Sequence, residues 1–315
     1  MEKKFDVLVI GELNVDIILH NIDNFPEVGK EVLAQQMTLT LGSSSAIFAS
    51  NISGLGASVA FLGKIGKDEF GDIVLHDLRK QNVDVSMIQT DNQLSTGATI
   101  VLSVKEDRAN ITYPGAMDHL TINDISEEDL SKAKHIHFSS YFMQPGFRGD
   151  LGKLFKRCKE LGLTTSFDMQ WDPHEKWDLN IKDVLPYVDV FFPNEQELLL
   201  LTAKSNIREA IDSIKKYVKI LAVKRGNQGS VVFYDGNLKN MPPFLNKKVI
   251  DTTGAGDSFN AGFILKYING NSITECQEFG NLMGAVSTTA AGGVKAFTNF
   301  ENVKNIAKNK FGIVL

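Results

Sequence analysis

VIDTTGAGDSFNAG, residues 249–262, is the stretch from which the fold of this 315-residue chain can be worked out. Its small residues at 254–256 let the backbone approach a ligand closely, and apolar side chains at 259, 263 and 267 predict a helix directly behind them. A helix start presents backbone N–H groups and the positive end of the helix dipole. We therefore expect Gly254, Ala255 and Gly256 to form an anion hole for a phosphate or a transferring phosphoryl group.

Asp257 stands in this predicted anion hole, where a carboxylate would repel a phosphate. It is better suited to act as a general base that accepts the proton of an attacking hydroxyl group. One alternative is a dinucleotide-binding fingerprint, but Phe259 replaces its third glycine and the segment lies far from the first strand. A glycine-rich helix start without any ligand is the other alternative. The P-loop pattern Gly-x-x-x-x-Gly-Lys-[Ser/Thr] does not occur in the sequence.

Short apolar segments alternate with amphipathic ones along most of the chain. A helical stripe runs from Leu151 to Leu161, Asp68 predicts the N-cap of another helix, and Ser272 with Glu275 predicts a capping box. Such alternation predicts a doubly wound α/β fold, in which a mostly parallel sheet is flanked by helices on both faces. The strands are expected at 5–10, 58–65, 134–138, 163–167, 188–192 and 219–223.

Two stretches, at about 13–41 and 95–115, carry β-rich runs without helices. The runs Glu31–Ala34 and Thr99–Val104 are examples, and the polar residues Glu106–Arg108 predict a hairpin turn. We expect these runs to form a small second sheet, inserted twice into one domain that spans residues 1–315. A small sheet beside a large α/β core is suited to act as a lid.

The composition narrows the class of protein. Hydrophobic residues make up 43% and charged residues 23%, which excludes a disordered chain, and the net charge of −5 gives no reason to expect nucleic-acid binding. No apolar run approaches the roughly 18 residues that span a bilayer. Cys158 and Cys276 provide neither a disulfide framework nor a zinc site, so we expect a reduced, soluble, cytoplasmic protein. His135 and His137 are expected to be packed or at the surface rather than bound to a metal.

Several segments, taken together, resemble the ribokinase-like (PfkB) family of carbohydrate kinases. Asp251–Phe259 is similar to that family's C-terminal signature, and Gly63–Gly71 to its N-terminal signature. The other matches are Gly11–Asp16 with the first-strand motif, Pro26–Ala34 with the first lid strand, Pro193–Glu197 with the Asn-x-x-Glu motif, and Lys224–Gly229 with the nucleotide loop. These matches occur in order over nearly the whole chain.

The resemblance implies ATP and Mg²⁺ as cofactors. Asn194 and Glu197 would hold water molecules around Mg²⁺, although the same pair could simply cap a helix. The implied nucleotide-binding residues are Asn194, Glu197, Lys224, Gly226, Gly229 and Asn281. A potassium-like cation beside the anion hole is a further implied ligand, with oxygens from Asp251, Thr253 and the carbonyl groups around 288–293.

The resemblance also implies a sugar site that includes Asn14, Asp16 and Gly42. The first two leave the first strand at its carboxyl end, where ligands bind in open α/β sheets. In this site Ser43 replaces the family's second glycine and Ile47 replaces its asparagine. One hydrogen bond to the substrate is thereby lost, while a hydroxyl group and an apolar wall are gained.

A second departure from the family lies at Asp172. This residue takes the place of an arginine in a segment that resembles the Asp-x-Asn-x-Arg-Pro segment of fructokinases and ketodeoxygluconate kinases. An aspartate would repel a sugar-acid carboxylate, which argues against a keto-acid substrate. A sugar phosphate is disfavoured less, because Lys30 or Arg108 on the lid could supply positive charge.

The sequence thus leads to the hypothesis of an ATP-dependent kinase that phosphorylates a primary alcohol of a small sugar or sugar-like molecule. A nucleoside kinase on the same scaffold is the nearest alternative, since Ile47 and Phe48 could wall a base. A non-catalytic sugar-binding protein that kept the fold is another. The resemblance further suggests a homodimer through the lid, and neither nucleic acid nor a membrane is expected as a partner.

Overall fold

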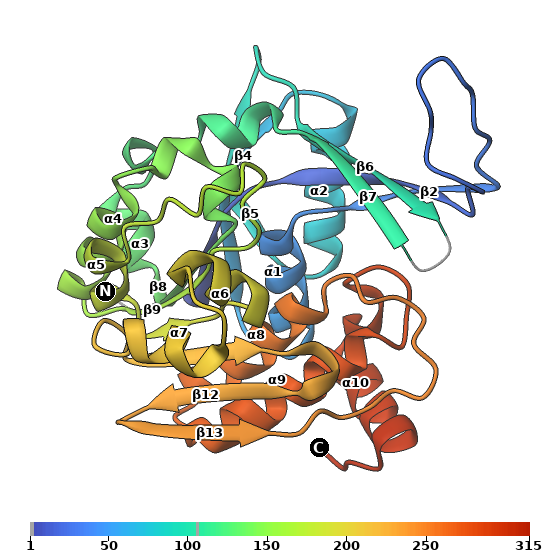
Figure 1. Cartoon of the computed structure of the whole chain (residues 1–315). Helices are drawn as coiled ribbons and strands as arrows, with labels where there is room; N and C mark the ends of the chain where they lie inside the picture. The colour runs from blue at the N-terminus through green and yellow to red at the C-terminus, as the bar shows by residue number, and fades with distance from the viewer. Residues whose placement is uncertain (1–2, 105–106) are drawn as a thin grey trace.

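A nine-stranded sheet forms the body of the molecule in the computed structural model, which describes residues 3–104 and 107–315 (Figure 1). The strand order is β13-β12-β11-β10-β9-β8-β1-β4-β5, and all pairs are parallel except those of β11 with β12 and β12 with β13. The strands are β1 (Phe5–Ile10), β4 (Val59–Gly66), β5 (Asp84–Asp91), β8 (Ala133–Ser139), β9 (Thr164–Asp168), β10 (Val190–Phe191), β11 (Ile220–Lys224), β12 (Ser230–Tyr234) and β13 (Asn237–Met241). The predicted doubly wound, mostly parallel sheet is confirmed, although the strand expected at 188–192 is shorter.

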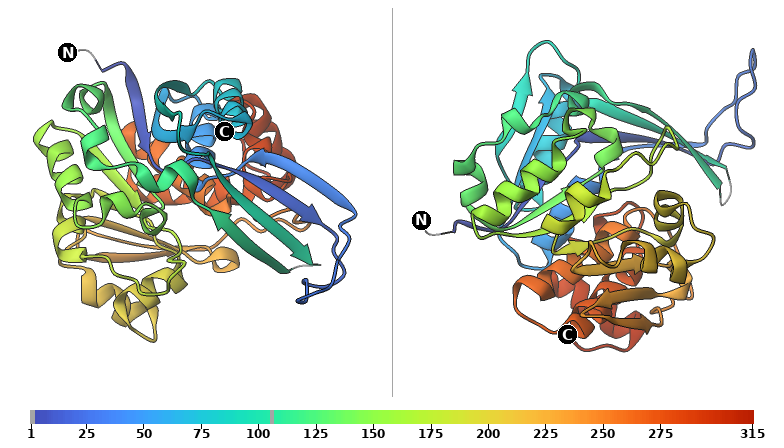
Figure 2. Two further views of the ribbon diagram at one scale, coloured as in Figure 1. Left: turned by 90° about the horizontal axis from the view of Figure 1, so that it is seen from above. Right: turned by 60° about the vertical axis from the view of Figure 1, so that its left-hand side comes forward.

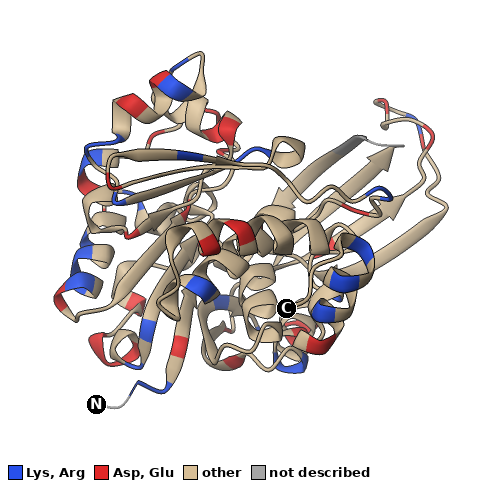
Figure 3. Cartoon of the chain, turned by 90° about the horizontal axis from the view of Figure 1, so that it is seen from below, with Lys and Arg blue, Asp and Glu red and all other residues tan. Residues whose placement is uncertain are grey.

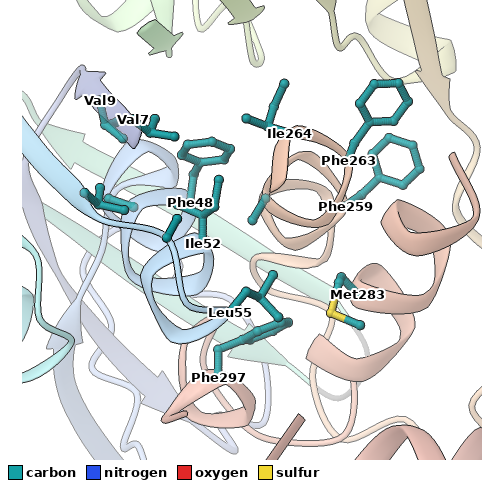
Figure 4. Close-up of a cluster of buried hydrophobic side chains, with 14 of the residues drawn as sticks. Val7, Val9, Phe48, Ile52, Leu55, Phe259, Phe263, Ile264, Met283 and Phe297 are labelled. Atoms are coloured by element: carbon teal, nitrogen blue, oxygen red, sulfur yellow. The ribbon is translucent and has the colours of Figure 1, made fainter. Parts of the chain in front are cut away.

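Helices cover both faces of this sheet because successive residues of its strands point to opposite sides. Val7 and Val9 of β1 belong to one buried core, which Figure 4 shows in close-up, and Leu8 and Ile10 belong to the other. The first core is covered by α1 (Ser44–Gly54), α2 (Glu69–Lys80), α8 (Ala255–Ile268), α9 (Ile273–Ser287) and α10 (Phe300–Ile306). The second is covered by α3 (Glu127–Ser131), α4 (Leu151–Glu160), α5 (Ile181–Val184), α6 (Glu195–Thr202) and α7 (Ile207–Ile214).

A second sheet, here called the small sheet, has four strands among the described residues and extends from one side of the body (Figures 1 and 2). Its order is β3 (Gln36–Leu41), β2 (Asn14–His20), β6 (Gly97–Val104) and β7 (Asp107–Tyr113). Its strands come from two separate stretches of the chain, residues 14–41 and 97–113. One face of the small sheet carries exposed apolar side chains, including Met37, Leu39, Ile100 and Ile111.

Two details of the small sheet differ from the prediction. The segment Pro26–Ala34, expected to be the first lid strand, forms no strand, and this includes the run Glu31–Ala34. It belongs to a loop that extends away from the body in Figure 2. Among the described residues no strand pairs with this loop, and Leu33 is 80% exposed; β2 pairs instead with the next segment, β3. Of the predicted hairpin turn, Glu106 lies outside the described residues, while Asp107 and Arg108 already belong to β7.

Charged residues of both signs are interspersed along the helices on the face shown in Figure 3. Within the described part of the chain, no helix has both the length and the apolar character needed to cross a membrane.

Asp68 connects the body to the base of the small sheet. As predicted, its side chain caps α2, with Gly71 N–H donating to Oδ1 at 2.8 Å. The same carboxylate accepts from the backbone N–H of Thr96 at 2.7 Å and from its hydroxyl group at 2.6 Å, and Thr96 directly precedes β6. Burial acts to raise the pKa of Asp68, but the hydrogen bonds from Thr96 and Gly71 outweigh it and the pKa is lowered.

We predict that Asp68→Ala lowers the free energy of unfolding by about 2–3 kcal/mol, about 1 for the helix cap and about 1 for each bond to Thr96. Urea unfolding followed by circular dichroism at pH 7 measures this change. Because the pKa is lowered in the folded state, this stabilisation is present above pH 3.8 and is lost as the pH falls through the lowered value. Asp72→Ala, at an exposed position in the first turn of the same helix, is the control and should change stability by less than about 0.5 kcal/mol. Equal losses in the two variants would contradict the assignment.

Candidate active site

The site lies at the carboxyl ends of the parallel strands, where the first turn of α8 meets them. Gly254 caps α8 with a φ of 73°, in the left-handed region that favours glycine. A Cβ atom there would lie 2.7 Å from Gly293 Cα and 2.9 Å from Ile47 Cγ2, so no larger residue fits without displacing its neighbours. Of the three residues predicted to form the anion hole, Ala255 already donates its N–H to Thr252 O at 3.2 Å. Gly256 lies one residue further into the first turn of the helix.

Asp257 follows in that first turn and is 7% exposed. Its Oδ1 accepts a hydrogen bond from Gln170 Nε2 at 3.0 Å. Burial, with the negative charges of Asp168 and Glu12, raises the pKa of Asp257 to about 8, although Lys224 opposes this shift. The site thus holds a carboxyl group whose pKa is close to neutral pH, as suits a group that exchanges protons during a reaction.

Asp168, at the end of β9, joins α8 to β11. Its Oδ2 accepts from Lys224 Nζ at 2.5 Å and from Asn260 Nδ2 at 2.6 Å. Lys224 ends β11, and Asn260 lies three residues after Asp257 on α8. Lys224 Nζ also lies 3.6 Å from where a Cβ atom of Gly256 would be, so its ammonium group lies beside the first turn of α8.

Asn194 and Glu197 form the capping box of α6. Asn194 Oδ1 accepts from Glu197 N–H, and Glu197 Oε2 accepts from Asn194 N–H, both at 2.8 Å. The pair therefore caps a helix, as the simpler interpretation expects. Burial and the charge of Asp168 raise the pKa of Glu197 to about 7, although Lys224 opposes this shift. The capping residue Glu197 therefore interacts electrostatically with Asp168 and Lys224.

The donor set here suits a water-bound divalent cation. The negative charge of Asp168 raises the pKa of both Glu197 and Asp257, and Lys224 opposes both shifts. This excess of negative charge would favour a cation. Across the described ranges, no three His, Cys, Asp or Glu side chains gather as a direct metal-ligand set. Mg²⁺ held by water molecules and phosphate oxygens, rather than by a cage of side chains, agrees with both observations.

Asn14, Asp16 and Gly42, the residues predicted to form the sugar site, lie together in the structure. Asn14 Nδ2 donates to Asp16 Oδ1 and to Thr99 Oγ1, each at 3.0 Å. A Cβ atom on Gly42 would lie 2.3 Å from Asp16 Oδ1 and 2.5 Å from Asn14 Nδ2, so the glycine makes room for both polar groups. The small sheet and the start of α1 thus meet at these residues.

Ser43 contributes differently from what the sequence suggests. The Ser43 hydroxyl donates to Glu12 O at 2.6 Å and accepts from Ala46 N–H at 2.9 Å, so the group expected to face the substrate has two internal partners. Its φ of 68° is unusual for a residue with a side chain. Ile47 is 5% exposed and packs against Gly254 and Gly293, so it forms an apolar wall beside the start of α8.

Phe48 does not line the site. It is fully buried and stacks on His137, with ring centroids 3.7 Å apart. The expectation that it could wall a nucleobase is therefore wrong. His137 and His135 are both buried and both hydrogen-bond to the Ser166 hydroxyl at 2.7 Å, which confirms that they are packed histidines.

The predicted nucleotide-binding residues Gly226, Gly229 and Asn281 lie around the turn between β11 and β12. Gly226 and Gly229 have φ values of 54° and 83°, and a Cβ atom on Gly229 would lie 2.1 Å from Met241 O. Asn281 on α9 donates to Pro242 O at 3.1 Å. Gly229 and Asn281 therefore both adjoin the segment that follows β13.

Asp251 and Thr253 lie beside the segment from which the cation carbonyls were expected. Asp251 accepts from Thr253 N–H at 2.9 Å and from Gly292 N–H at 2.8 Å. Ile250 N–H donates to Thr288 O at 2.9 Å, and the Ser287 hydroxyl donates to Thr253 O at 3.4 Å. Hydrogen bonds thus join the segment around Asp251 and Thr253 to residues 287–292.

Asp172 has a structural role that the sequence does not reveal. It is 2% exposed and accepts hydrogen bonds from the backbone N–H groups of His174, Lys176 and Trp177, at 2.7–2.9 Å. Its charge is therefore satisfied within its own loop. The expectation that this carboxylate repels an acidic substrate has no support in this geometry.

Four residues of the site were not predicted from the sequence: Glu12, Asp168, Gln170 and Asn260. Glu12 is 4% exposed and accepts from the hydroxyl groups of Ser44 and Ser45 at the start of α1. For two of these four residues, Asp168 and Asn260, their positions in the sequence could have indicated a place in the site. Asp168 directly follows the strand predicted at 163–167. Asn260 follows Asp257 by three residues, which places the Asp257 and Asn260 side chains on one face of the helix.

Comparisons with known proteins agree with this geometry. A family model described as pfkB family carbohydrate kinase matches residues 4–298. A relative from Archaeoglobus fulgidus, described as an uncharacterized sugar kinase, is 32% identical over 234 residues, which are 74% of this chain and 92% of that protein. An ATP-dependent ribose-1-phosphate kinase from Halopiger xanaduensis is 28% identical over 303 residues, 93% of this chain and 95% of that protein.

Solved structures show the same architecture. A ribokinase-II-like protein from E. coli, crystallised with ATP and Mg²⁺, has a TM-score of 0.83 at 25% identity and covers 96% of this chain and 99% of its own. The residues brought together at the strand ends and the match over residues 4–298 lead to one conclusion. The chain belongs to the PfkB family of carbohydrate kinases.

Proposed function

We propose that this protein transfers the γ-phosphoryl group of ATP to a primary alcohol of a small sugar or sugar-like substrate. The observation that carries the proposal is the buried Asp257 beside the start of α8, with its pKa raised to about 8. A base next to a helix start supplies both needs of the reaction, because it takes the proton of the hydroxyl group while N–H donors and the helix dipole stabilise the phosphoryl group.

The remaining residues divide between the two substrates. Asn14 and Asp16 would bind sugar hydroxyls, Gly42 makes room for them, and Ile47 would form an apolar wall. Lys224, Gly226, Gly229 and Asn281 would bind ATP. The small sheet would act as the lid that excludes water, which otherwise competes with the sugar for the phosphoryl group.

Mg²⁺ bound with ATP would neutralise the charge that develops on the phosphates, and Asn194 and Glu197 would hold its water molecules. Asp251 and Thr253 would contribute oxygens to a potassium-like cation beside the anion hole. A nucleoside as acceptor is the second candidate, and the apolar side chain of Ile47 is the observation that favours it.

The first prediction is that one class of acceptor gives strong ADP release from Mg-ATP in a panel of free sugars, sugar phosphates, inositols and nucleosides. Asp257→Asn should lower kcat for that acceptor by about 10²- to 10⁴-fold, because the base is lost. Parallel assays in potassium and potassium-free buffer test the monovalent cation. A variant that kept the wild-type kcat would contradict the role of Asp257.

Stability measurements separate lost chemistry from lost folding in this experiment. Since the pKa of Asp257 is raised on folding, stability falls as the pH rises from 3.8 to about 8, because the carboxyl group ionises in the unfolded chain before it ionises in the folded one. Asn cannot ionise, so Asp257→Asn should unfold at the same or a higher temperature than wild type at pH 8. A lower melting temperature would indicate a damaged fold instead.

The second prediction concerns pH. Because Asp257 must be ionised to accept a proton and its pKa is about 8, kcat/KM for the acceptor should rise about tenfold per pH unit below that value and level off above it. Initial rates between pH 6 and 9 at constant ionic strength measure this. A flat profile over this range would show that proton transfer to Asp257 does not limit the reaction.

The third prediction concerns assembly. We propose a homodimer through the outer face of the small sheet, where Leu39 and Ile111 are 41% and 63% exposed. Such an apolar patch favours association. The double variant Leu39→Lys, Ile111→Lys should sediment as a 34.8 kDa monomer, and wild type at twice that mass. Wild-type protein that sediments as a monomer at micromolar concentration would overturn this proposal.

A further inference from the structure

Gln170 is the one described residue that donates a side-chain hydrogen bond to Asp257. Its Nε2 lies 3.0 Å from Asp257 Oδ1. This hydrogen bond to Oδ1 restricts rotation of the carboxylate, and no described side chain donates a hydrogen bond to Oδ2. A general base must be held within hydrogen-bond reach of the proton it takes, and small displacements cost much of the rate.

The backbone of Gln170 is itself held in an unusual conformation. Its φ of 60° is in the left-handed region, which residues with a side chain seldom adopt. Gln170 N–H donates to Asp168 Oδ1 at 3.3 Å, so the neighbouring carboxylate supports this turn. A strained residue that persists next to a reacting group points to a functional constraint.

Asp168 is in turn fixed from two directions. Its other oxygen accepts from Lys224 at the end of β11 and from Asn260 on α8. Asn260 belongs to the same helix as Asp257, so these hydrogen bonds form a closed network. Asn260 on α8 donates to Asp168, Asp168 accepts from the Gln170 backbone, and the Gln170 side chain donates to Asp257 on α8. The angle of the Asp257 carboxylate is therefore set by β9 and β11 as well as by α8.

We propose that Gln170 is a positioning residue for Asp257, and that the Asp168, Lys224 and Asn260 side chains hold it in place for this purpose. The inference rests on the proposed function, because it assigns to Asp257 the role of the base. It separates Gln170 from the sugar-binding residues: its loss should slow the chemical step without weakening acceptor binding.

The experiment compares Gln170→Ala with wild type, using Mg-ATP and the acceptor found in the panel. We expect kcat to fall about 10- to 100-fold, the effect of losing a hydrogen bond to a charged group, while KM for the acceptor changes less than about threefold. In the Asp257→Asn background, the same substitution should change the residual kcat less than about twofold. A residue that acts only through Asp257 has nothing further to lose when that carboxylate is absent.

Gln89→Ala is the matched control. Gln89 is also partly buried, and its Nε2 donates a hydrogen bond of 3.1 Å to Asp124 O, on β5 at the far edge of the sheet. It should leave kcat unchanged, while both variants should have similar melting temperatures.

Three results would overturn the inference. These are an unchanged kcat in Gln170→Ala, a raised KM with unchanged kcat, or an equal loss of kcat in both backgrounds. If instead Asp257→Asn keeps the wild-type kcat, the proposed base itself is wrong and this inference falls with it. The two failures are therefore distinguishable.

Discussion

The arrangement of the whole site depends on burying three carboxyl groups next to one lysine. The charge of Asp168 acts on both Glu197 and Asp257 and raises their pKa values, and Lys224 is the cation that opposes both shifts. Such a cluster is costly to bury unless its members are paired and hydrogen-bonded. The fold meets this need by bringing the ends of β9 and β11, the start of α6 and the first turns of α8 to one place. The elements that stabilise the cluster are thus the same elements that build the active site.

The layered architecture could be predicted from the sequence because its physical signals are local. Alternating apolar segments and caps such as Asp68 are properties of a few neighbouring residues. Even the family could be inferred, since its motifs are contiguous. The false strand at Glu31–Ala34 shows the limit of this method: an alternating pattern predicts a strand, but only a partner strand makes one, and β2 pairs with the residues that follow.

The parts of the site that could not be predicted are those made between distant segments. Gln170 and Asp257 are 87 residues apart, and Asp168 and Asn260 are 92 residues apart. No local pattern encodes such contacts. Ser43 illustrates the same limit in the opposite direction, because the sequence shows a new hydroxyl group but not the two internal partners that occupy it.

The order of these parts along the chain has a consequence for biosynthesis. Asn14, Asp16 and Gly42, the residues proposed to bind the sugar, belong to the first sixth of the chain, whereas Gly254 to Asp257 come after four fifths of it. During synthesis, the residues proposed to bind the sugar therefore leave the ribosome long before the proposed base and the helix start beside it. A chain terminated before Gly254 lacks both, so we expect such a fragment to transfer no phosphoryl group from ATP.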